Sequence, residues 1–522
     1  MFERLGEKLN LSAIPQIFFS AAIFVILFVC AAIPFHEQFA DFFGAIGGFT
    51  FRYFGWFYVA TVSGLLIFLV WVALSRFGGM KLGRDEEKPE YSATTWFAML
   101  FAAGIGTILM FWGVAEPLSH FANPPLEGIE PQTIDAAKHA MNIALYHFAL
   151  HTWTIFTLPA LAISYFTYRK NLPMRISSIF YGVLGDRVFG PIGWVIDVIA
   201  LVGTLFGVAV SVGLGTLQLN SGLNHVLGVP VGSTSQIVII AVITIIATIS
   251  VALGLDKGIK RLSEFNIGIA LFVMLFIWVC GPTLFITSGI VQNFGNYMQN
   301  LPWMAFWTEA YQGTSWQQSW TVFYWAWTIA WAPYVGIFIA RISRGRTIRQ
   351  FVIGSLGAPS LFSLVWFTVF GLAAMDLELN QGVDLVTQVQ ADVSIALFEF
   401  LSHYPMAIFM SLLGLIVIII FLTTSADSAA LVVDQLSRSN LQVSKTGQRI
   451  FWTFMLGAVA GTLMLGGGLP ALQNVITALG FPFCVLLVFM AWAMKQSLQK
   501  DYEEERLMAE QTAQEARINQ AR

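Results

Sequence analysis

The chain has 522 residues, of which 57% are hydrophobic and only 11% are charged, and its formal net charge is −3. Soluble domains carry about 25% charged residues, so this composition excludes a soluble globular protein and indicates a polytopic membrane protein. No polar, basic segment is present that could form a nucleic-acid-binding domain, so no nucleic acid is expected as a partner.

Apolar stretches long enough to cross a bilayer recur along the whole chain. They lie near 13–33, 54–75, 94–113, 141–166, 190–214, 235–254, 265–288, 318–340, 351–374, 405–426, 450–466 and 472–494. The first stretch lacks a convincing cleavage site and is taken as a span, not as a signal peptide. We therefore predict an all-α integral membrane protein with twelve transmembrane helices.

Lys and Arg are distributed unevenly between the two sides of these spans. If the N-terminus is cytoplasmic, the segments inside the cell contain 25 of the 27 basic residues, and they are 1–12, 76–92, 167–190, 255–264, 341–350, 436–449 and 495–522. Only Arg52 and Lys138 then lie outside. Because cytoplasmic loops carry the excess of Lys and Arg, both termini are predicted to be cytoplasmic.

Two spans contain helix breakers in their middle. Gly104 and Gly106 interrupt the third span, "LFAAGIGTILMFWGVAEP", and Pro333 lies within the eighth, "AWTIAWAPYVG". A broken helix frees backbone groups, which are tolerated where they line a polar cavity and can there bind ions or substrate. The positions of the two breaks suit two inverted five-helix repeats, spans 3–7 and 8–12. The alternative is that the glycines only permit close packing and the proline only kinks its helix.

An aromatic stripe follows one face of the eighth span. At 100° per residue, one direction is shared by Trp320, Phe323, Tyr324, Trp327, Trp331, Tyr334 and Phe338, whereas Trp325 points away. Phe148, Trp153 and Phe156 share a broad face of the fourth span. These rings could be a packed aromatic core, but indole faces also bind cations, and quaternary ammonium ions are well suited to them.

The tenth span carries hydroxyl groups in "FLTTSADSAALVVD", at Thr423, Thr424, Ser425 and Ser428. Such groups are unfavourable in a membrane unless they face a polar site, and their oxygens suit an alkali cation. The alternative is that the hydroxyls bond only to their own helix.

A different class of function, an intramembrane metalloenzyme, would use His147 and His151, which are one helical turn apart. The sequence offers no adjacent Glu and no evident third ligand, so we predict no enzyme and no metal cofactor. Glu116 and Asp197 are further acids within or near the spans, and could be proton sites or could form hydrogen bonds at helix ends.

The motifs "FYWAW…IAWAPYVGIFIARISRGRTIR", "AAGIG…FWGVAEP" and "TTSADS" resemble those of the betaine/choline/carnitine transporter family. The resemblance covers essentially the whole chain. It implies a leucine-transporter-like fold, trimers in the bacterial inner membrane, and uptake of compatible solutes, which are small zwitterionic or cationic osmolytes, by alternating access.

The resemblance also implies a division of the chain. It consists of the N-terminus 1–12, two extra helices in 13–92, a first inverted repeat in 93–288, an interfacial helix and outer loop in 289–317, a second inverted repeat in 318–494, and a cytoplasmic tail in 495–522.

Carried over by position, the family's substrate site implies contacts from Phe148, Trp153, Phe156, Trp327, Thr328, Trp331, Ala103, Gly104 and Gly106. One sodium ion, the coupling ion, is implied between the backbone of Ala102, Ile105 and Phe421 and the hydroxyls of Thr424 and Ser425. A second sodium site would retain Thr204, with Val208 in place of its other hydroxyl.

The chain also departs from the family pattern. Many glycine betaine carriers have Trp at the positions of Thr328 and Phe148 and Tyr at that of Phe156, and Ile108 replaces a third glycine that proton-coupled choline carriers often replace with Asp. No Lys or Arg occupies span five or ten, where sodium-independent exchangers place one. We therefore expect a sodium symporter of glycine betaine. The alternatives are proton-coupled or exchange-type transport of choline or carnitine, and sodium-coupled transport of taurine or dimethylsulfoniopropionate.

Overall fold

The computed structural model describes residues 1–104, 106–254, 256–438 and 443–521. Within these ranges the chain is helical, and its only β-type pairing is an isolated bridge between Lys81 and Thr347. The principal helices are α1 (Phe2–Lys8), α2 (Pro15–Ala32), α3 (His36–Leu74), α4 (Ala93–Gly104), α5 (Thr107–Ala122), α6 (Ile134–Phe148), α7 (Leu150–Ser164), α8 (Tyr181–Leu184), α9 (Pro191–Leu227), α10 (Ser233–Leu253), α11 (Asp256–Cys280), α12 (Thr283–Met304), α13 (Phe323–Arg341), α14 (Ile348–Gln381), α15 (Leu385–Ala391), α16 (Ala396–Ser402), α17 (Ala407–Leu436), α18 (Thr446–Leu465) and α19 (Leu469–Ala521).

Short turns of other helix types connect these elements. They are η1 (Arg76–Gly79), η2 (Tyr165–Arg169), η3 (Ser177–Phe180), η4 (Gly185–Phe189), η5 (Gln318–Val322) and η6 (Val393–Ile395). The π-helical turn η5 leads directly into α13. The tail is helical, since α19 continues without interruption from the last apolar stretch through 495–521.

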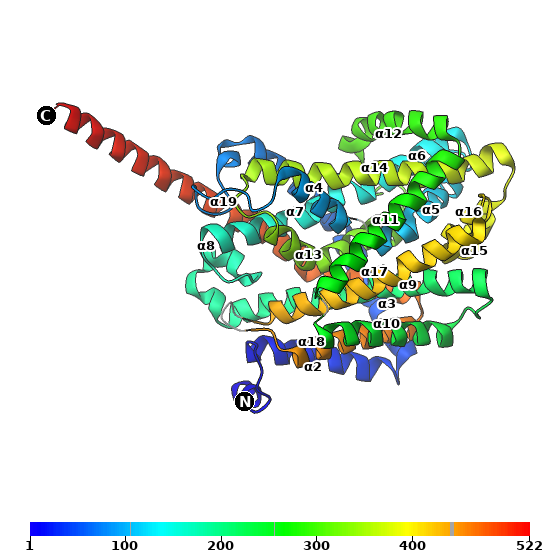
Figure 1. Ribbon diagram of the computed structural model, residues 1–522, viewed down its shortest axis with the longest axis horizontal. Helices are drawn as coiled ribbons and strands as arrows, with labels where there is room; N and C mark the ends of the chain where they lie inside the picture. The colour runs from blue at the N-terminus through cyan, green and yellow to red at the C-terminus, as the bar shows by residue number, and fades with distance from the viewer. Residues whose placement is uncertain (105, 255, 439–442, 522) are drawn as a thin grey trace.

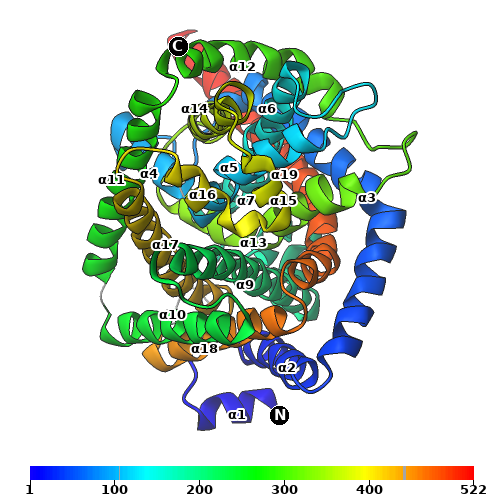
Figure 2. The ribbon, with the colours of Figure 1, turned by 90° about the vertical axis from the view of Figure 1, so that its right-hand side faces the viewer.

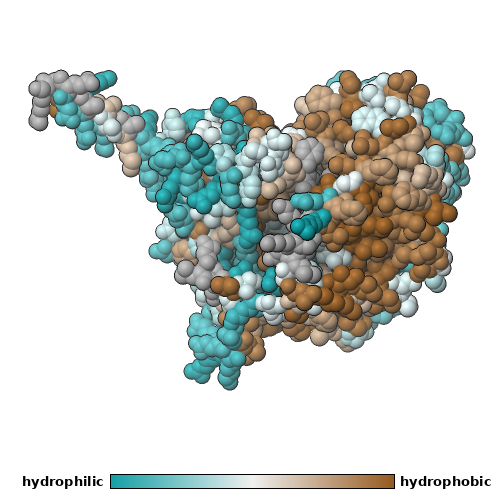
Figure 3. Space-filling view, viewed as in Figure 1, coloured by the Kyte–Doolittle hydropathy of each residue, from teal (hydrophilic) through white to brown (hydrophobic). Residues whose placement is uncertain are grey.

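Ten helices in the described part of the chain are long and apolar enough to cross a membrane. Large apolar side chains on the outer helices are exposed, for example Ile245 and Ile249 on α10 and Phe272 and Leu275 on α11. In Figure 3 a hydrophobic surface covers one side of the molecule, while hydrophilic residues gather at the end where the termini lie. An outer surface of this kind suits contact with lipid, as expected of a multi-pass membrane protein.

The core of the bundle is formed by α7, α9, α13 and α14, whose residues are mostly buried. Figure 2 shows α13 and α7 near the centre of the bundle, with α3, α10 and α11 at its periphery. Both chain termini lie at the same end of the molecule (Figure 1). The C-terminal end of α17 also lies there, because the amide of Ile14 donates to the carbonyl of Ser437.

The predicted break in the third span is confirmed. Helix α4 ends at Gly104 and α5 begins at Thr107. Gly106 between them is extended, with φ −153° and ψ −176°. The two helices together follow the predicted stretch, and neither alone is long enough to count among the ten membrane-crossing helices.

The fourth span is also broken, which the sequence did not predict. Helices α6 and α7 are separated at Ala149, with φ −104° and ψ −123°. The amide of Leu150 donates to the hydroxyl of Tyr297 on α12 at 3.3 Å, and the hydroxyl of Thr152 donates to the carbonyl of His147. The helix is interrupted because the amide of Leu150 and the carbonyl of His147 bond to side-chain hydroxyls in place of the backbone groups of a regular helix.

The prediction that Pro333 breaks the eighth span is wrong. Helix α13 runs continuously from Phe323 to Arg341 with Pro333 inside it. Its neighbours support it closely, since a Cβ added to Gly336 would lie 3.1 Å from the side chain of Pro159 on α7. Packing on several sides therefore keeps α13 helical although the proline removes one backbone hydrogen bond.

The arginine-rich segment after α13 docks the loop that follows α3. Leu82 exchanges backbone hydrogen bonds of 2.8 Å with Gly345 and Arg346, and the Arg346 guanidinium lies 4.1 Å above the ring of Trp96. Arg344 donates to both carboxylate oxygens of Glu87, which lowers the pKa of that carboxyl group. These arginines thus anchor the end of α13 to the first third of the chain.

Candidate functional site

A cavity of about 360 Å³ lies in the centre of the bundle, where α5, α7, α9, α13 and α17 meet. Of the residues predicted to contact substrate, those that line it are Gly106, Phe148, Trp153, Phe156, Trp327, Thr328 and Trp331. Of those predicted to bind sodium, it is lined by Phe421, Thr424 and Ser425. Residues far apart in the sequence are thus brought to one cavity.

Aromatic rings from α7 and α13 form one side of the cavity, called here the aromatic wall: Trp153, Phe156, Trp327 and Trp331. The ring centroids of Trp153 and Phe156 are 5.5 Å apart, and those of Phe156 and Trp331 are 5.2 Å apart, both edge to face. Trp331 is half-buried, whereas the other three are buried. Edge-to-face contacts fix the rings in place and leave faces available to a cation.

Trp327 is held by a hydrogen bond as well as by stacking. Its indole Nε1 donates to the carbonyl of Gly207 on α9 at 2.9 Å, and its ring stacks on Phe323 with centroids 5.7 Å apart. A Cβ on Gly207 would lie 2.8 Å from the Cβ of Trp331, so only glycine allows α9 to approach α13 this closely. Gly207 therefore sets the position of the aromatic wall.

Phe148 and Thr328 lie near the end of the cavity formed by α6 and the start of α13. The centroid of the Phe148 ring lies 5.0 Å from that of Tyr324 and 4.6 Å from that of Phe367 on α14. The Thr328 hydroxyl donates to the carbonyl of Tyr324, one turn earlier on the same helix, at 2.6 Å. That hydroxyl has its proton committed and offers only lone pairs to the cavity.

The predicted stripe on the eighth span only partly faces the cavity. Five of its seven members line it: Tyr324, Trp327, Trp331, Tyr334 and Phe338. Phe323 packs behind Trp327, and Trp320 lies beside Trp112. Trp325 points away as predicted, and stacks on His151 at 5.6 Å.

Hydroxyl groups of α17 form another part of the cavity lining, called here the hydroxyl wall: Thr424, Ser425 and Ser428, together with Phe421. The Thr424 hydroxyl donates to the carbonyl of Ile420 at 2.8 Å, which leaves its oxygen lone pairs free to bind a cation. Thr423 is also bonded to its own helix, through Ile419 at 2.9 Å, and does not line the cavity.

Other predicted ligands lie elsewhere or cannot be placed. Ile105 lies outside the described residues, as do the side chains of Ala102 and Ala103, and Gly104 is the last residue of α4. Val208 lines the cavity, whereas Thr204 does not. The Thr204 hydroxyl is fully buried and has no hydrogen-bond partner among the described residues.

The cavity extends to the end of the molecule where the termini lie. Arg341, at the end of α13, both lines the cavity and is exposed. Its guanidinium donates to Gln435 near the end of α17, close to the N-terminal segment. The cavity is therefore accessible from this end.

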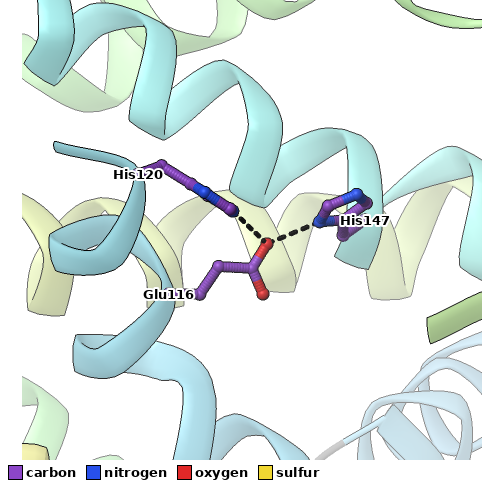
Figure 4. Close-up of side chains that lie close together, drawn as sticks. All are labelled: Glu116, His120 and His147. Atoms are coloured by element: carbon purple, nitrogen blue, oxygen red, sulfur yellow. Dashed lines mark hydrogen bonds and ion pairs between the residues drawn. The ribbon is translucent and has the colours of Figure 1, made fainter. Parts of the chain in front are cut away.

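At the other end, Glu116, His120 and His147 form a buried cluster (Figure 4). His147 Nδ1 lies 2.6 Å and His120 Nε2 lies 3.3 Å from the same carboxylate oxygen of Glu116. Sequence reasoning missed this cluster. The spacing of Glu116 and His120, one turn apart on α5, was an available signal, but the sequence could not show that α6 brings His147 to the same point.

His147 and His151 do not converge on a shared site. Each has its own partner, because His151 Nε2 lies 3.4 Å from the Ser63 hydroxyl whereas His147 bonds to Glu116. Asp197 is paired with Arg175 and accepts from the amide and hydroxyl of Ser177, which anchors the turn before α9. Asp197 therefore has a structural role, and the alternative in which His147 and His151 share a metal ion does not fit their separate partners.

Comparisons with known proteins agree on one family. A family model described as betaine/carnitine/choline family transporter matches residues 16–503. The ectoine/glycine betaine/proline transporter of Corynebacterium glutamicum is 44% identical over 95% of this chain and 82% of its own length. The glycine betaine transporter of Acinetobacter baylyi is 41% identical over 93% of this chain and 74% of its own length. The high-affinity choline transport protein of Escherichia coli is 39% identical over 96% of this chain and 74% of its own length.

Proposed function

The chain belongs to the betaine/carnitine/choline transporter family, and from this premise we propose that it imports glycine betaine by sodium symport. The family membership supports uptake of a compatible solute. The choice of solute and of coupling ion comes from the two walls of the cavity. The single observation that carries the proposal is that aromatic rings and hydroxyl groups line one and the same cavity.

The aromatic wall suits a quaternary ammonium group. A trimethylammonium head cannot donate hydrogen bonds and is attracted to ring faces by up to about 2 kcal/mol or more when water is excluded. Trp153, Phe156 and Trp331 supply three rings in contact with one another. The names of several relatives include glycine betaine, which agrees with this chemistry.

The hydroxyl wall suits a sodium ion. Sodium prefers oxygen ligands, and Thr424 and Ser425 present hydroxyls beside Phe421 at the cavity surface. In this proposal the backbone of Ala102 and Ile105, at the interruption of the third span, completes the ion's shell. Thr204 would contribute to a second sodium ion, which its hydroxyl, without a hydrogen-bond partner among the described residues, supports.

The proposal includes a membrane arrangement. Helices α4 and α5 would make one crossing and α6 and α7 another, which gives twelve crossings in two inverted repeats after two extra helices. Both termini would face the cytoplasm of a bacterium, with the chain in the inner membrane as a homotrimer. The distribution of Lys and Arg supports this orientation.

In this orientation the structure is open to the cytoplasm, since the cavity reaches the exposed Arg341. Sodium would stabilise the outward-open state, and substrate would complete the aromatic wall and allow closure, so that binding is followed by opening to the other side. Transport then requires both sodium and substrate, because sodium stabilises the outward-open state and substrate stabilises the closed one.

Two alternatives remain attached to specific residues. The first is a proton-coupled or exchange-type carrier of choline or carnitine, since the Escherichia coli relative is named for choline. Proton coupling is disfavoured because Ile108 offers no carboxylate at the cavity. Exchange is disfavoured because α9 and α17 contain no Lys or Arg. A sodium-coupled carrier of a solute such as taurine or dimethylsulfoniopropionate is favoured only by Thr328, whose hydroxyl replaces a further ring.

The test is uptake of labelled glycine betaine into proteoliposomes that contain the full chain, with an inward sodium gradient. Choline, carnitine, taurine, dimethylsulfoniopropionate and proline serve as competitors. Sodium-dependent uptake that only quaternary ammonium compounds inhibit supports the proposal. Uptake that persists with a proton gradient and no sodium, or the absence of betaine uptake while a competitor enters, would contradict it.

A further inference from the structure

The cluster of Glu116, His120 and His147 has no part in the proposed binding of substrate or sodium. All three side chains are at most 1% exposed. One oxygen of Glu116 and one nitrogen of each histidine lie within 4.8 Å of one another. Figure 4 shows the two imidazole rings directed at the same carboxylate oxygen from α5 and α6.

The charges of this cluster are not balanced by a permanent cation. The ion pairs of Glu116 are with His120 and His147, and histidines are charged only when protonated. Among the ion pairs of the described residues, none joins Glu116 to Lys or Arg. A carboxylate buried in a membrane protein is unfavourable without a cationic partner, so the cluster favours binding of a cation.

Two polar atoms of the cluster also have no hydrogen-bond partner within the described ranges. They are the second carboxylate oxygen of Glu116, whose neighbour is the Tyr324 hydroxyl, and Nδ1 of His120. Buried polar atoms are nearly always bonded, and an exception calls for an ion or a water molecule that would satisfy it. A cation bound by Glu116 would satisfy its second oxygen, whereas Nδ1 of His120 calls for a water molecule.

We propose that Glu116, His120 and His147 bind a divalent transition-metal ion of the zinc type. Two imidazoles and one carboxylate are an established zinc ligand set, with metal–ligand distances of about 2.0–2.2 Å. Two ligands of one tetrahedral ion at these distances lie about 3.3 Å apart. The 3.3 Å between His120 Nε2 and Glu116 matches this separation, and His147 Nδ1 would move away from Glu116 by less than about 1 Å from its present 2.6 Å. The ligands would be His147 Nδ1, His120 Nε2 and a Glu116 oxygen, with water in the remaining position.

The surroundings hold the His147 ring in the required form. An imidazole that binds a metal through one nitrogen keeps its proton on the other, which needs an acceptor. His147 Nε2 lies 2.9 Å from the Thr321 hydroxyl, which can accept that proton's hydrogen bond. His120 packs against Trp316 and Trp320, with ring centroids at 5.2 and 4.4 Å.

The site has an entry path and a structural consequence. His147 lines the central cavity, so an ion can reach the cluster from there. Bound to α5 and α6 next to the Thr321 of η5, the ion would hold together the end of the cavity opposite Arg341. The inference does not depend on which solute is transported, and its test does not use uptake.

The experiment is titration of Co²⁺ into the full-length protein, purified in detergent with an affinity tag that contains no histidine. We expect one Co²⁺ per chain, with the strong visible absorption of a four- or five-coordinate ion, and displacement by Zn²⁺. Glu116→Gln and His120→Gln should each weaken binding by at least about tenfold, and Thr321→Val, which removes only the supporting hydrogen bond, by about tenfold.

Two histidines serve as matched controls. His139 lies near the start of the same helix α6, and His151 is equally buried one turn beyond His147 but bonds to Ser63. His139→Gln and His151→Gln should leave Co²⁺ affinity unchanged. The proposal is overturned if the unaltered protein binds no stoichiometric Co²⁺, if the absorption is that of a six-coordinate surface ion, or if the control variants weaken binding as much as His120→Gln. The first two outcomes need no variant to fold.

Discussion

The aromatic wall and the hydroxyl wall of the cavity are held in place by different interactions. Rings of the aromatic wall depend on other helices, since Phe156 on α7 packs on Trp331 of α13 and Trp327 bonds to Gly207 of α9. The hydroxyl of Thr424 depends only on its own helix, through Ile420. We therefore expect substitutions in the aromatic wall to alter both stability and substrate binding, and those in the hydroxyl wall to alter ion binding alone.

Trp327→Ala should have the largest effect. The residue is 1% exposed and loses both its stacking on Phe323 and its hydrogen bond to Gly207. Replacing a buried Trp by Ala destabilises a protein by about 3–5 kcal/mol. The apparent melting temperature in detergent should fall clearly and uptake should be lost. If the variant had the same apparent melting temperature as the unaltered protein, the Trp327 ring would not be needed to hold the aromatic wall in place.

Trp331→Ala should mainly weaken substrate binding. The side chain is half-buried and its ring borders the cavity. Loss of a cation–π contact of about 1–2 kcal/mol lowers affinity about 5- to 30-fold. Binding of glycine betaine can be followed by tryptophan fluorescence, with Trp331→Phe as the control that keeps a ring. Equal losses in the two variants would argue against a contact with the ring face.

Thr424→Ala should raise the sodium concentration needed for half-maximal uptake by about 5- to 10-fold, because one oxygen ligand worth about 1 kcal/mol is removed. Thr423 is the matched control, since it is adjacent, bonds to its own helix in the same way and does not line the cavity. Thr423→Ala should leave the sodium dependence unchanged. Similar shifts in both variants would place the ion elsewhere.

Thr328→Val should have the smallest effect. Its hydroxyl donates to the Tyr324 carbonyl and Val keeps the shape of the side chain. The affinity for glycine betaine should change by less than about threefold, the equivalent of about 0.6 kcal/mol. Competition by glycine betaine against a labelled substrate measures this change. A loss above tenfold would mean that the hydroxyl contacts the substrate directly.

Local features of the fold could be predicted from the sequence. Gly104 and Gly106 predicted the interruption between α4 and α5, because glycine readily leaves the helical conformation. The back-bonding of Thr423 and Thr424 was one of two recognised possibilities, and it occurs. In both cases the deciding atoms lie within a few residues of one another.

Features decided by distant segments could not be predicted. The break at Ala149 depends on Tyr297, and the continuity of α13 through Pro333 depends on packing against α7. The contact of His147 with Glu116 likewise needs two helices to meet. Helical periodicity placed Trp327 and Trp331 on one face of the eighth span and Trp153 and Phe156 on one face of the fourth, but that these two faces line one site was implied only by the resemblance to a known family.

The most direct test of the account compares two variants in one uptake assay, with glycine betaine and sodium varied separately. The account predicts that Trp331→Ala raises the KM for glycine betaine about tenfold while the half-saturating sodium concentration changes several-fold less. Thr424→Ala should raise the half-saturating sodium concentration, while the KM for glycine betaine changes several-fold less. Equal shifts of both parameters in both variants would contradict the assignment of the two walls to two different ligands.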